Sequence, residues 1–330
     1  MRDVVIIGAG IAGLTAARTL QNEGRTVTVL EASDRVGGRA FSPMRDGHRL
    51  DLGPTWVWDT ETAIHSLLNE LGIQTFPHFD SGVDRYETDV IQRVQMPRSH
   101  VPERRVHGGV QGIANALAAS VEHIHLNRPV MEVRGTSDGV IVHTDAGEVR
   151  ARHVLAALPP RRLAPLVPTA KRASLWREVP TWMQDIAKVV MVFERRYWVD
   201  QGWSGRAFSR RGPMMEVHDM SGPDGTPACL FGFVPRVLAD GPLAERAIEQ
   251  VQRLLGAVIT PQSVHVQAWW DAHEPIDPSA QDRMSLLGDP RLRDPSLDGR
   301  LHLISCETSA VSPGHINGAV ERAIAVCEGR

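Results

Sequence analysis

The sequence predicts an α/β protein in which a nucleotide-binding domain carries a second, inserted α+β domain. Three observations support this prediction. The first forty residues have the pattern of a strand, a glycine-rich turn, a helix and a second strand. Short strand patterns separated by turn residues recur through the middle of the chain, and a strand, turn and helix pattern closes it. The length of 330 residues exceeds that of a usual single core, so two domains are expected.

The composition excludes several classes of protein. Hydrophobic residues make up 42% and charged residues 23%, which is typical of a soluble globular chain rather than a disordered one. The formal net charge of -3 and the lack of a basic tract argue against a nucleic-acid partner. No apolar run approaches the roughly 20 residues that span a bilayer, so we expect no membrane segment.

The cysteines and the N-terminus predict a cytoplasmic protein. Cys229, Cys306 and Cys327 are odd in number and widely spaced, which suits a reducing compartment and small buried side chains. The first strand pattern begins within three residues of Met1 and leaves no room for a signal peptide. The 14 histidines include no H-E-x-x-H or similar spacing, so we expect no metal site.

The N-terminal stretch RDVVIIGAGIAGLTAARTLQNEGRTVTVLEAS has the order of a dinucleotide-binding βαβ unit. Residues 4–7 form a continuous apolar run typical of a buried parallel strand. Gly8, Gly10 and Gly13 follow in G-x-G-x-x-G spacing and open a helix pattern over residues 12–23. Because strand, glycines and helix occur in the required order, the motif is far more specific than the glycine spacing alone.

Each part of this unit has a physical role in binding a dinucleotide. Gly8 permits the tight turn, Gly10 lets the backbone approach a pyrophosphate, and Gly13 lets the helix pack on the strand. The helix N-terminus offers free N–H groups to the phosphates. A second strand over residues 26–30 ends at Glu31, whose carboxylate can accept the ribose hydroxyls and disfavours the 2′-phosphate of NADP. FAD and NAD remain as alternatives.

Two stretches downstream favour FAD. DRVGGRA, at residues 34–40, places paired glycines and the fixed cation of Arg39 directly after the acid. LDLGPTWVW, at residues 50–58, is a short strand that ends in a glycine turn and aromatic residues. A nicotinamide-binding fold would continue with further βα units instead.

The motifs G-A-G-I-A-G, E-A-S-D-R-V-G-G-R and D-L-G-P-T-W resemble those of the flavin-containing amine oxidoreductase family, the monoamine and polyamine oxidases. The resemblance implies a Rossmann-like FAD domain, with these segments along the ADP half, the pyrophosphate and the flavin. It departs at Ser33, where relatives often carry an arginine. The cofactor-binding residues that it implies are Gly8, Gly10, Ile11, Ala12, Gly13, Glu31, Ala32, Gly38, Arg39, Gly53, Pro54, Thr55 and Trp56.

The middle of the chain contains one more element of the family pattern and one structural helix. Residues 105–160 have the pattern of a helix followed by short strands, and in the family the residue matching Val130 contacts the adenine through its backbone. Residues 243–255 form an amphipathic helix pattern. Trp269 and Trp270 either face the flavin or pack in the core, and core packing is the better interpretation for at least one of them.

The stretch QDIAKVVMVFERRYW places a lysine within an apolar strand pattern. Lys171 and Lys188 are the only lysines among 36 basic residues, so arginine is the usual choice of this chain. One interpretation is that the Lys188 ammonium reaches the surface along its apolar stem. The other follows from the family, in which a lysine on this strand holds a water next to flavin N5. A buried lysine can shift its pKa whereas arginine stays charged, so we favour the second interpretation and assign Lys188 a catalytic role.

The C-terminal stretch resembles the closing strand, turn and helix of the family. Residues 301–305 form the strand, Cys306 and Glu307 the turn, and the helix begins at Ile316 or Asn317. The resemblance implies that Glu307 lies by the ribityl and pyrophosphate groups. It also implies that the backbone N–H of Ile316 donates to the N1–C2=O edge of the flavin, where negative charge collects on reduction.

Three departures from the family affect the active site. No cysteine occurs near residues 282–287, so FAD is expected to be non-covalent. His315 replaces a common cage tyrosine, and Asn317 replaces an acid two residues later. His315 either binds or polarises the substrate, which would make it catalytic, or is a wall residue without catalytic weight. About fifty residues separate GPTW from HGGVQG, where larger relatives carry a helical cap, so the site is open or another chain, a partner or a second copy, covers it.

We therefore predict an FAD domain from residues 1–58, 105–168 and 296–330, and a substrate domain from residues 59–104 and 169–295. The expected activity is oxidation of a small amine or amino-acid-like substrate by hydride transfer to FAD, with O2 as acceptor and H2O2 as product. The alternatives are a non-amine flavin dehydrogenase or desaturase, an oxidiser of NAD(P)H that resembles renalase, and an accessory flavoprotein that works with a partner subunit.

Overall fold

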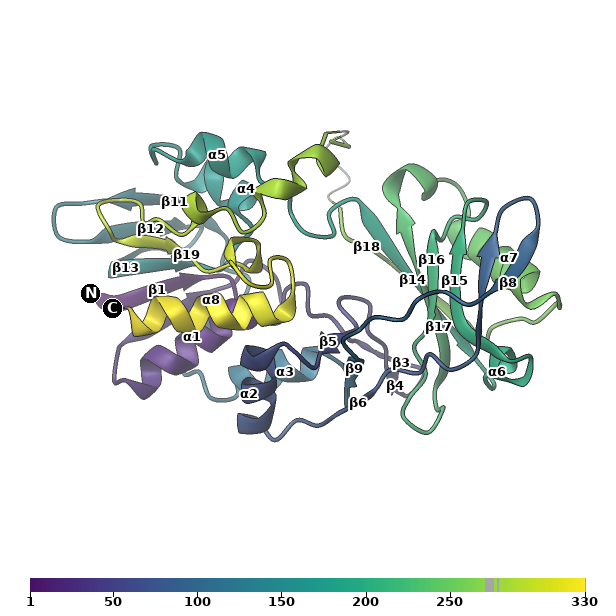
Figure 1. Ribbon diagram of the computed structural model, residues 1–330. Coiled ribbons are helices and arrows are strands. Elements are labelled where there is room, and N and C mark those ends of the chain that lie inside the picture. The colour runs from purple at the N-terminus through teal and green to yellow at the C-terminus, as the bar shows by residue number, and fades with distance from the viewer. Residues whose placement is uncertain (271–275, 278, 330) are drawn as a thin grey trace.

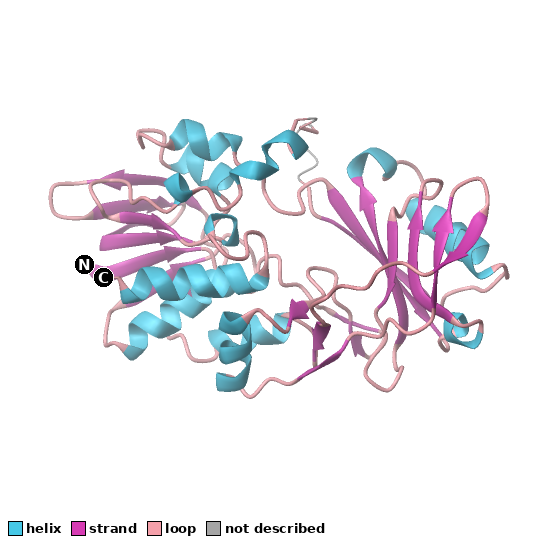
Figure 2. Cartoon of the chain, in the orientation of Figure 1, coloured by secondary structure: helices cyan, strands magenta, loops and turns pink. Residues whose placement is uncertain are grey.

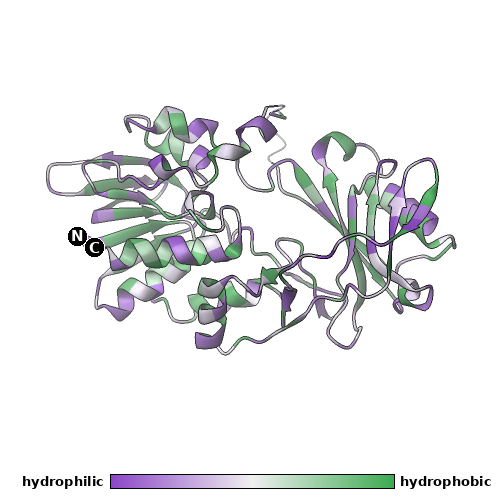
Figure 3. Cartoon of the chain, viewed as in Figure 1, coloured by the Kyte–Doolittle hydropathy of each residue, from purple (hydrophilic) through white to green (hydrophobic). Residues whose placement is uncertain are grey.

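Two β-sheets occupy opposite ends of the molecule (Figure 1, Figure 2). The computed structural model describes residues 1–270, 276–277 and 279–329. Both termini lie at the end of the first domain that is farther from the second sheet (Figure 1). Apolar residues are frequent in the strands and on helix α8, whereas polar residues occupy many loops, outer helix faces and some strand positions (Figure 3). Among the described residues there is no helix that could span a membrane.

The first sheet has the strand order β10, β2, β1, β13, β12, β11, and β19 pairs with β13. The pairs of β1 with β2 and β13, of β2 with β10 and of β13 with β19 are parallel, and β11 to β13 form an antiparallel meander. Helices cover both faces, α1, α2, α3 and α8 on one and α4 and α5 on the other (Figure 1). The strands are β1 (Arg2–Ile7), β2 (Val27–Leu30), β10 (Ile124–His125), β11 (Val130–Gly135), β12 (Val140–Thr144), β13 (Gly147–Ala156) and β19 (Leu301–Leu303). The helices are α1 (Ile11–Asn22), α2 (Thr62–Glu70), α3 (Gln111–Ala118), α4 (Pro160–Leu163), α5 (Ala173–Glu178) and α8 (Ile316–Glu328).

The second sheet has the strand order β18, β14, β17, β16, β15, β7, β8. Its pairs are antiparallel except that β7 and β15 run parallel. The strands are β7 (Val83–Glu87), β8 (Ile91–Val94), β14 (Ile186–Phe193), β15 (Trp203–Ser209), β16 (Glu216–Asp219), β17 (Ala228–Pro235) and β18 (Ser263–Ala268). Helices α6 (Tyr197–Asp200) and α7 (Leu243–Leu255) lie beside it, and α7 forms over the residues predicted from the sequence.

Two small sheets lie between the domains. Strand β9 (Glu103–Val106) pairs with both β5 (Val57–Trp58) and β6 (Thr75–Pro77), and a short hairpin joins β3 (Met44–Arg45) to β4 (His48–Arg49). The chain therefore leaves the first domain after β6, forms β7 and β8 of the second sheet, and returns through β9 (Figure 1).

Strand β14 connects the core of the second domain to the site because its side chains alternate between the two faces of the sheet. Ala187 and Val189 pack in the apolar core under α7. Val190 points the other way and packs in a smaller core with Leu50 from the N-terminal part of the chain. Lys188 shares this second face, toward the FAD-binding motifs.

Two helices pack differently from their predicted domain assignment. Helix α2 lies within residues 59–104, yet Ile64, Leu67 and Leu68 belong to the core that α8 and α1 share. Helix α5 lies within residues 169–295, yet Trp176 is buried against the opposite face of the first sheet. Motif order cannot locate such boundaries, because a helix joins whichever core buries its apolar face. The division into domains otherwise stays a prediction.

Candidate active site

The glycine turn after β1 has the shape of a phosphate-binding cradle. Gly8 has a φ of 100°, which favours glycine. A Cβ on Gly13 would lie 2.0 Å from the carbonyl oxygen of Gly8, so the helix packs directly on the turn. A Cβ on Gly10 would meet the Gly37 carbonyl oxygen only at 4.0 Å, so this residue leaves room for a ligand beside the backbone.

Helices α1 and α8 supply free backbone N–H groups at one edge of the first sheet. Each begins after a parallel strand of that sheet, and neither has a hydrogen bond from a side-chain cap. The N-terminus of a helix carries partial positive charge, so two uncapped N-termini fit a pyrophosphate and a flavin that becomes anionic on reduction. Ile316 is the first residue of α8, as the sequence predicts.

Glu31 orders the turn beneath the predicted ribose. One carboxylate oxygen accepts the Ala9 N–H at 2.7 Å. The other accepts the backbone N–H of Ser33 at 2.9 Å and its hydroxyl at 2.6 Å. Ser33, which stands where relatives often carry an arginine, therefore holds the carboxylate in place. Ala32 lies between the two residues, and Val130 begins β11.

The DRVGGRA loop lies against the glycine turn and carries an arginine toward the C-terminal motif. Gly37 bridges Gly10. The Arg39 guanidinium donates to both carboxylate oxygens of Glu307, at 2.7 and 3.2 Å. Burial favours a raised pKa for Glu307, but Arg39 and hydrogen bonds hold the pKa below its usual value, so the carboxylate is ionised. The structure thus joins residues that are 268 positions apart in the sequence.

The backbone of Trp182 completes the cluster around Arg39 and Glu307. The sequence did not predict this contact. The Trp182 carbonyl accepts from Arg39 at 3.3 Å, and its N–H donates to Glu307 at 3.2 Å. Cys306 lies within hydrogen-bond distance of the same pair, and burial raises the pKa of its thiol to about 12. A thiol with so high a pKa is a poor nucleophile, which agrees with FAD that is bound without a covalent link.

Lys188 is buried at the junction of the two domains. Its side chain is on β14, and the residue is 1% exposed, which excludes the interpretation that its ammonium reaches the surface. The ammonium donates to the Gly53 carbonyl at 3.0 Å and to the Thr55 hydroxyl, and it lies 4.2 Å from the centre of the Phe231 ring. Burial lowers the pKa of Lys188 to about 7, with Arg105 acting in the same direction and Asp51 against it.

Asp51 and Arg105 form a buried ion pair that fixes the turn after Leu50. No local pattern predicts this pair, because the partners are far apart in the chain. Arg105 donates to Asp51 at 3.4 Å and to the Ser221 carbonyl at 2.7 Å. The other Asp51 oxygen accepts the Ser42 hydroxyl at 2.6 Å and a backbone N–H of the α3 turn at 3.0 Å. Segments from both domains are thus tied to the Gly53–Thr55 turn that Lys188 contacts.

A cavity of about 440 Å³ opens beside Trp56 and extends over the second sheet. Aromatic, acidic and basic side chains line it. The aromatic ones are Trp56, Trp58, Phe79 and Phe208, the acidic ones are Asp80, Glu103, Glu216 and Asp219, and the basic ones are Arg98 and Arg206, with His78 and His218 between them. Arg98 is paired with Asp84 and Asp80, so its charge is balanced locally.

Strand register relates this cavity to Lys188. Lys188 lies opposite Phe233, Phe233 lies opposite Glu216, and Glu216 lies opposite Phe208. Residues directly opposite one another point to the same face, so these four side chains form a row across the sheet. Two strand spacings separate Lys188 from Glu216, which is about 10 Å. The Glu216 carboxylate and the Lys188 ammonium therefore lie on the same face of the sheet, two strands apart.

The histidines of the cavity are neutral. Burial, assisted by nearby positive charges, lowers the pKa of His78 to about 3. Burial also lowers the pKa of His218, although Glu216 opposes the shift. His78 accepts the indole N–H of Trp56 at 3.3 Å, and His218 stacks on Phe231 with ring centres 5.4 Å apart. Neutral rings next to Lys188 keep this part of the wall free of added charge.

The remaining predicted aromatic and histidine positions have different surroundings. Trp269 donates its indole N–H to the Leu52 carbonyl at 2.9 Å, next to the turn. Trp270 instead packs against the core of the second domain. His315 precedes α8 and contacts Glu61 at 2.7 Å, a partner that the sequence did not reveal.

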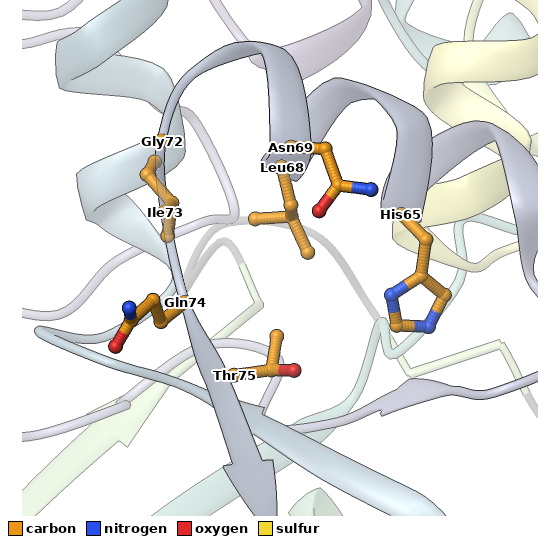
Figure 4. Close-up of a pocket in the computed structure, with 7 residues that line it drawn as sticks. All are labelled: His65, Leu68, Asn69, Gly72, Ile73, Gln74 and Thr75. Carbon is orange, nitrogen blue, oxygen red and sulfur yellow. The ribbon is translucent and has the colours of Figure 1, made fainter.

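A second cavity, of about 410 Å³, lies where α2 turns into β6 (Figure 4). None of the predicted site residues lines it. It is lined by His65, Leu68, Asn69, Gly72, Ile73, Gln74 and Thr75. The ring of His65 contacts the Trp58 carbonyl at 3.0 Å.

Comparison with known proteins identifies the family. A family model described as flavin containing amine oxidoreductase matches residues 11–102 and 91–329, which is most of the chain. The chain belongs to the flavin-containing amine oxidoreductase family. The family, the fold class and FAD as the cofactor are therefore confirmed, and the protein is an FAD-dependent oxidoreductase. The roles of individual residues stay predictions.

Relatives in the family differ in length from this chain. Putrescine oxidase of Kocuria rosea is 25% identical over 389 residues, covering 82% of this chain and 81% of the relative. The probable flavin-containing monoamine oxidase A of Dictyostelium discoideum is 22% identical over 440 residues, covering 97% and 95%. An alignment of 440 positions to a chain of 330 residues contains long gaps, and the two family matches meet within residues 91–102. The short cap is expected in this same segment.

Solved structures of the family share the fold. A putrescine oxidase with redesigned cofactor binding superposes with a TM-score of 0.86 at 22% identity, covering 99% of this chain and 98% of the other. Cyclohexylamine oxidase from Brevibacterium oxydans superposes with a TM-score of 0.84 at 21% identity, covering 99% of each chain. At these identities the likeness establishes the architecture, and the substrate has to be argued from the site.

Proposed function

We propose that this family member oxidises a small primary amine, with O2 as the electron acceptor and H2O2 as product. The observation that carries the proposal is Lys188, a buried ammonium with a pKa near 7 between the Gly53–Thr55 turn and an aromatic cavity. When bound, FAD accepts the hydride that leaves the carbon next to the amine nitrogen. The imine that results hydrolyses in water.

Lys188 has the properties that the reaction needs at the flavin edge. Its ammonium is held by two oxygen acceptors in a nearly water-free setting, where a positive charge stabilises negative charge more strongly than it would in water. Because its pKa is near 7, the group can also exchange a proton with a neighbouring water at neutral pH. An arginine at this position would remain charged.

The cavity supports a diamine as the more specific substrate. Aromatic rings and neutral histidines line it around Trp56, and the carboxylates of Glu103 and Glu216 also line it. Burial and the nearby Asp80 raise the pKa of Glu103, so a positive group on the substrate would relieve their repulsion. Four carboxylates and two guanidinium groups line the cavity, so a second ammonium on the substrate is favoured over a carboxylate. The named activity of the Kocuria rosea relative, putrescine oxidase, agrees with this choice.

The test is anaerobic mixing of the purified yellow protein with a panel of alkylamines, diamines, amino acids and NADH. We expect diamines and alkylamines to bleach the absorbance of the oxidised flavin, and air to restore it with one H2O2 for each turnover. Bleaching by NADH without bleaching by any amine would instead support an NAD(P)H oxidiser. Amine-dependent bleaching that air does not reverse would overturn O2 as the acceptor.

A further inference from the structure

His315, Glu61 and Trp58 form an ordered group beside the substrate cavity. The Glu61 side chain is 7% exposed, and one of its oxygens lies 2.7 Å from Nδ1 of His315. Its other oxygen accepts the backbone N–H of Trp58 at 3.1 Å. The imidazole stacks on the Trp58 ring with centres 4.6 Å apart and planes inclined by 28°. The ring is therefore fixed in both position and plane.

This arrangement selects one tautomer of the imidazole. An ionised carboxylate can only accept hydrogen bonds, so the proton of a neutral His315 resides on Nδ1. Nε2 is then left with a lone pair, and no partner for it occurs among the described residues. The side chain is 34% exposed, so a small molecule can reach it. A carboxylate on the far nitrogen also stabilises the imidazolium that forms when Nε2 takes a proton.

The imidazole is close both to a residue of the cavity and to the predicted cofactor residues. Trp58, on which it stacks, lines the cavity. Trp182 has its ring centre 6.3 Å from that of His315 and is hydrogen-bonded through its backbone to Arg39 and Glu307. Helix α8, which His315 precedes, begins at the same edge.

One charged group, Glu61, contacts the His315 ring directly. Glu61 touches it from the start of α2, and His65 of the same helix contacts the Trp58 carbonyl behind it. On the opposite side, Arg39 and Glu307 neutralise each other through a paired contact. The direct electrostatic influence on the ring is thus the negative charge of Glu61.

We propose that His315 is the base that takes the proton of the bound substrate ammonium, and that Glu61 is its positioning residue. The inference rests on the proposed amine oxidation. An alkylamine arrives protonated at neutral pH, and its nitrogen must lose a proton before hydride can leave the adjacent carbon. The proton moves from the ammonium nitrogen to Nε2 of His315, the nitrogen keeps the electron pair of the N–H bond, and no electrons pass to the protein.

Two substitutions of His315 test the roles of its two ring nitrogens separately. H315N keeps an N–H donor near the position of Nδ1, so Glu61 remains paired while the base is lost. H315Q keeps a polar group near Nε2 but loses the contact with Glu61. We expect kcat/KM of H315N for an alkylamine to fall by about 100-fold at neutral pH and to approach the wild-type value near the pKa of the amine, because free amine then binds from solution. The kcat/KM of E61Q should lie between those of the wild type and H315N. FAD content and Tm of each variant report folding.

A binding measurement tests the same step without turnover. tert-Butylamine has no hydrogen on the carbon next to its nitrogen, so it can bind but cannot be oxidised. Calorimetry of the FAD-loaded protein in two buffers with different ionisation enthalpies gives the number of protons released. We expect close to none for the wild type, because His315 keeps the proton, and about one for H315N. Equal proton release by both proteins, together with parallel pH profiles, would overturn the inference and point to another base such as Lys188. Failure of every amine to reduce the wild-type flavin would overturn the proposed function instead.

Discussion

The cofactor end and the substrate end of this molecule are built on different principles. The cofactor end uses backbone geometry, with glycines that let chain segments touch and two helix N-termini that offer N–H groups. The substrate end uses side chains from several strands, with Lys188, Phe233, Glu216 and Phe208 in one row across a sheet. Backbone geometry tolerates almost no change in residue type, whereas a side-chain row can alter its chemistry one residue at a time. The predictions below test this contrast.

The largest expected effect is at the cofactor end. In G13A the new Cβ would meet the Gly8 carbonyl oxygen at 2.0 Å, so helix α1 has to move off the turn and FAD binding is lost. The measurement is flavin content after purification, with circular dichroism to report folding. G112A is the matched control, since a Cβ there meets nothing within 4 Å and the site lies in helix α3. A yellow G13A protein with wild-type flavin content would contradict the prediction.

The next effect lies where the two ends meet. K188M replaces the buried ammonium by an apolar side chain of similar length, so the fold and FAD content should persist while kcat/KM with an amine falls by about 100-fold. K171M is the natural control, because Lys171 is the other lysine of the chain and is exposed. Stopped-flow traces would separate the reduction of the flavin by amine from its reoxidation by O2. Wild-type rates in both steps would remove Lys188 from the mechanism.

A smaller effect is expected at the far end of the side-chain row. E216Q removes one negative charge about 10 Å from Lys188, so kcat/KM for a diamine should fall by about tenfold while that for a monoamine of equal chain length stays the same. Glu216 is partly solvated, which limits the size of the effect. E245Q, on helix α7 at the other face of the sheet, is the control. An equal loss for both substrates would indicate damage to the cavity rather than loss of a charge contact.

The last prediction concerns stability, and how it depends on pH, rather than activity. The pKa of Lys188 is about 7 when folded, below its ordinary value, so between these two values the unfolded chain binds a proton that the folded chain does not. Stability attributable to Lys188 therefore rises with pH through this window, by at most about 1.4 kcal/mol for each pH unit. The measurement is urea unfolding of wild type, K188M and K171M across the window. As pH rises, the free energy of unfolding of wild type and of K171M should increase relative to that of K188M. Parallel plots of this free energy against pH for all three proteins would show that the Lys188 ammonium is not desolvated.

The contrast between the two ends also explains what could be predicted from the sequence. Gly8, Gly10, Gly13 and Glu31 form a local motif whose spacing carries its own geometry, so a dinucleotide-binding fold followed from it. The DRVGGRA and LDLGPTWVW stretches, which are also local motifs, then indicated FAD and the family. Lys188 stood out for a different reason, since a chain rich in arginine uses lysine only twice. The burial of that lysine depended on strands that pair with β14 from both sides.

The partners of the predicted residues depended on contacts between distant segments. Glu61 and His315 are 254 positions apart, and Asp51 and Arg105 are 54 apart, so neither pair leaves a local pattern. The placement of α2 in the first core has the same origin, because the helix buries its apolar stripe against α8 rather than against its neighbours in sequence.

The sequence by itself determined that this protein binds a dinucleotide in a βαβ unit, because glycine spacing, strand and helix are local properties of consecutive residues. The motifs that indicated FAD, at residues 34–40 and 50–58, are local in the same sense. The tertiary structure alone decided that Lys188 is buried, that Glu216 stands in its row and that His315 is held by Glu61. Those facts depend on how separate segments pack and on the charges that packing brings within a few ångströms. Burial and proximity set the protonation of each group, and both are properties of the folded chain.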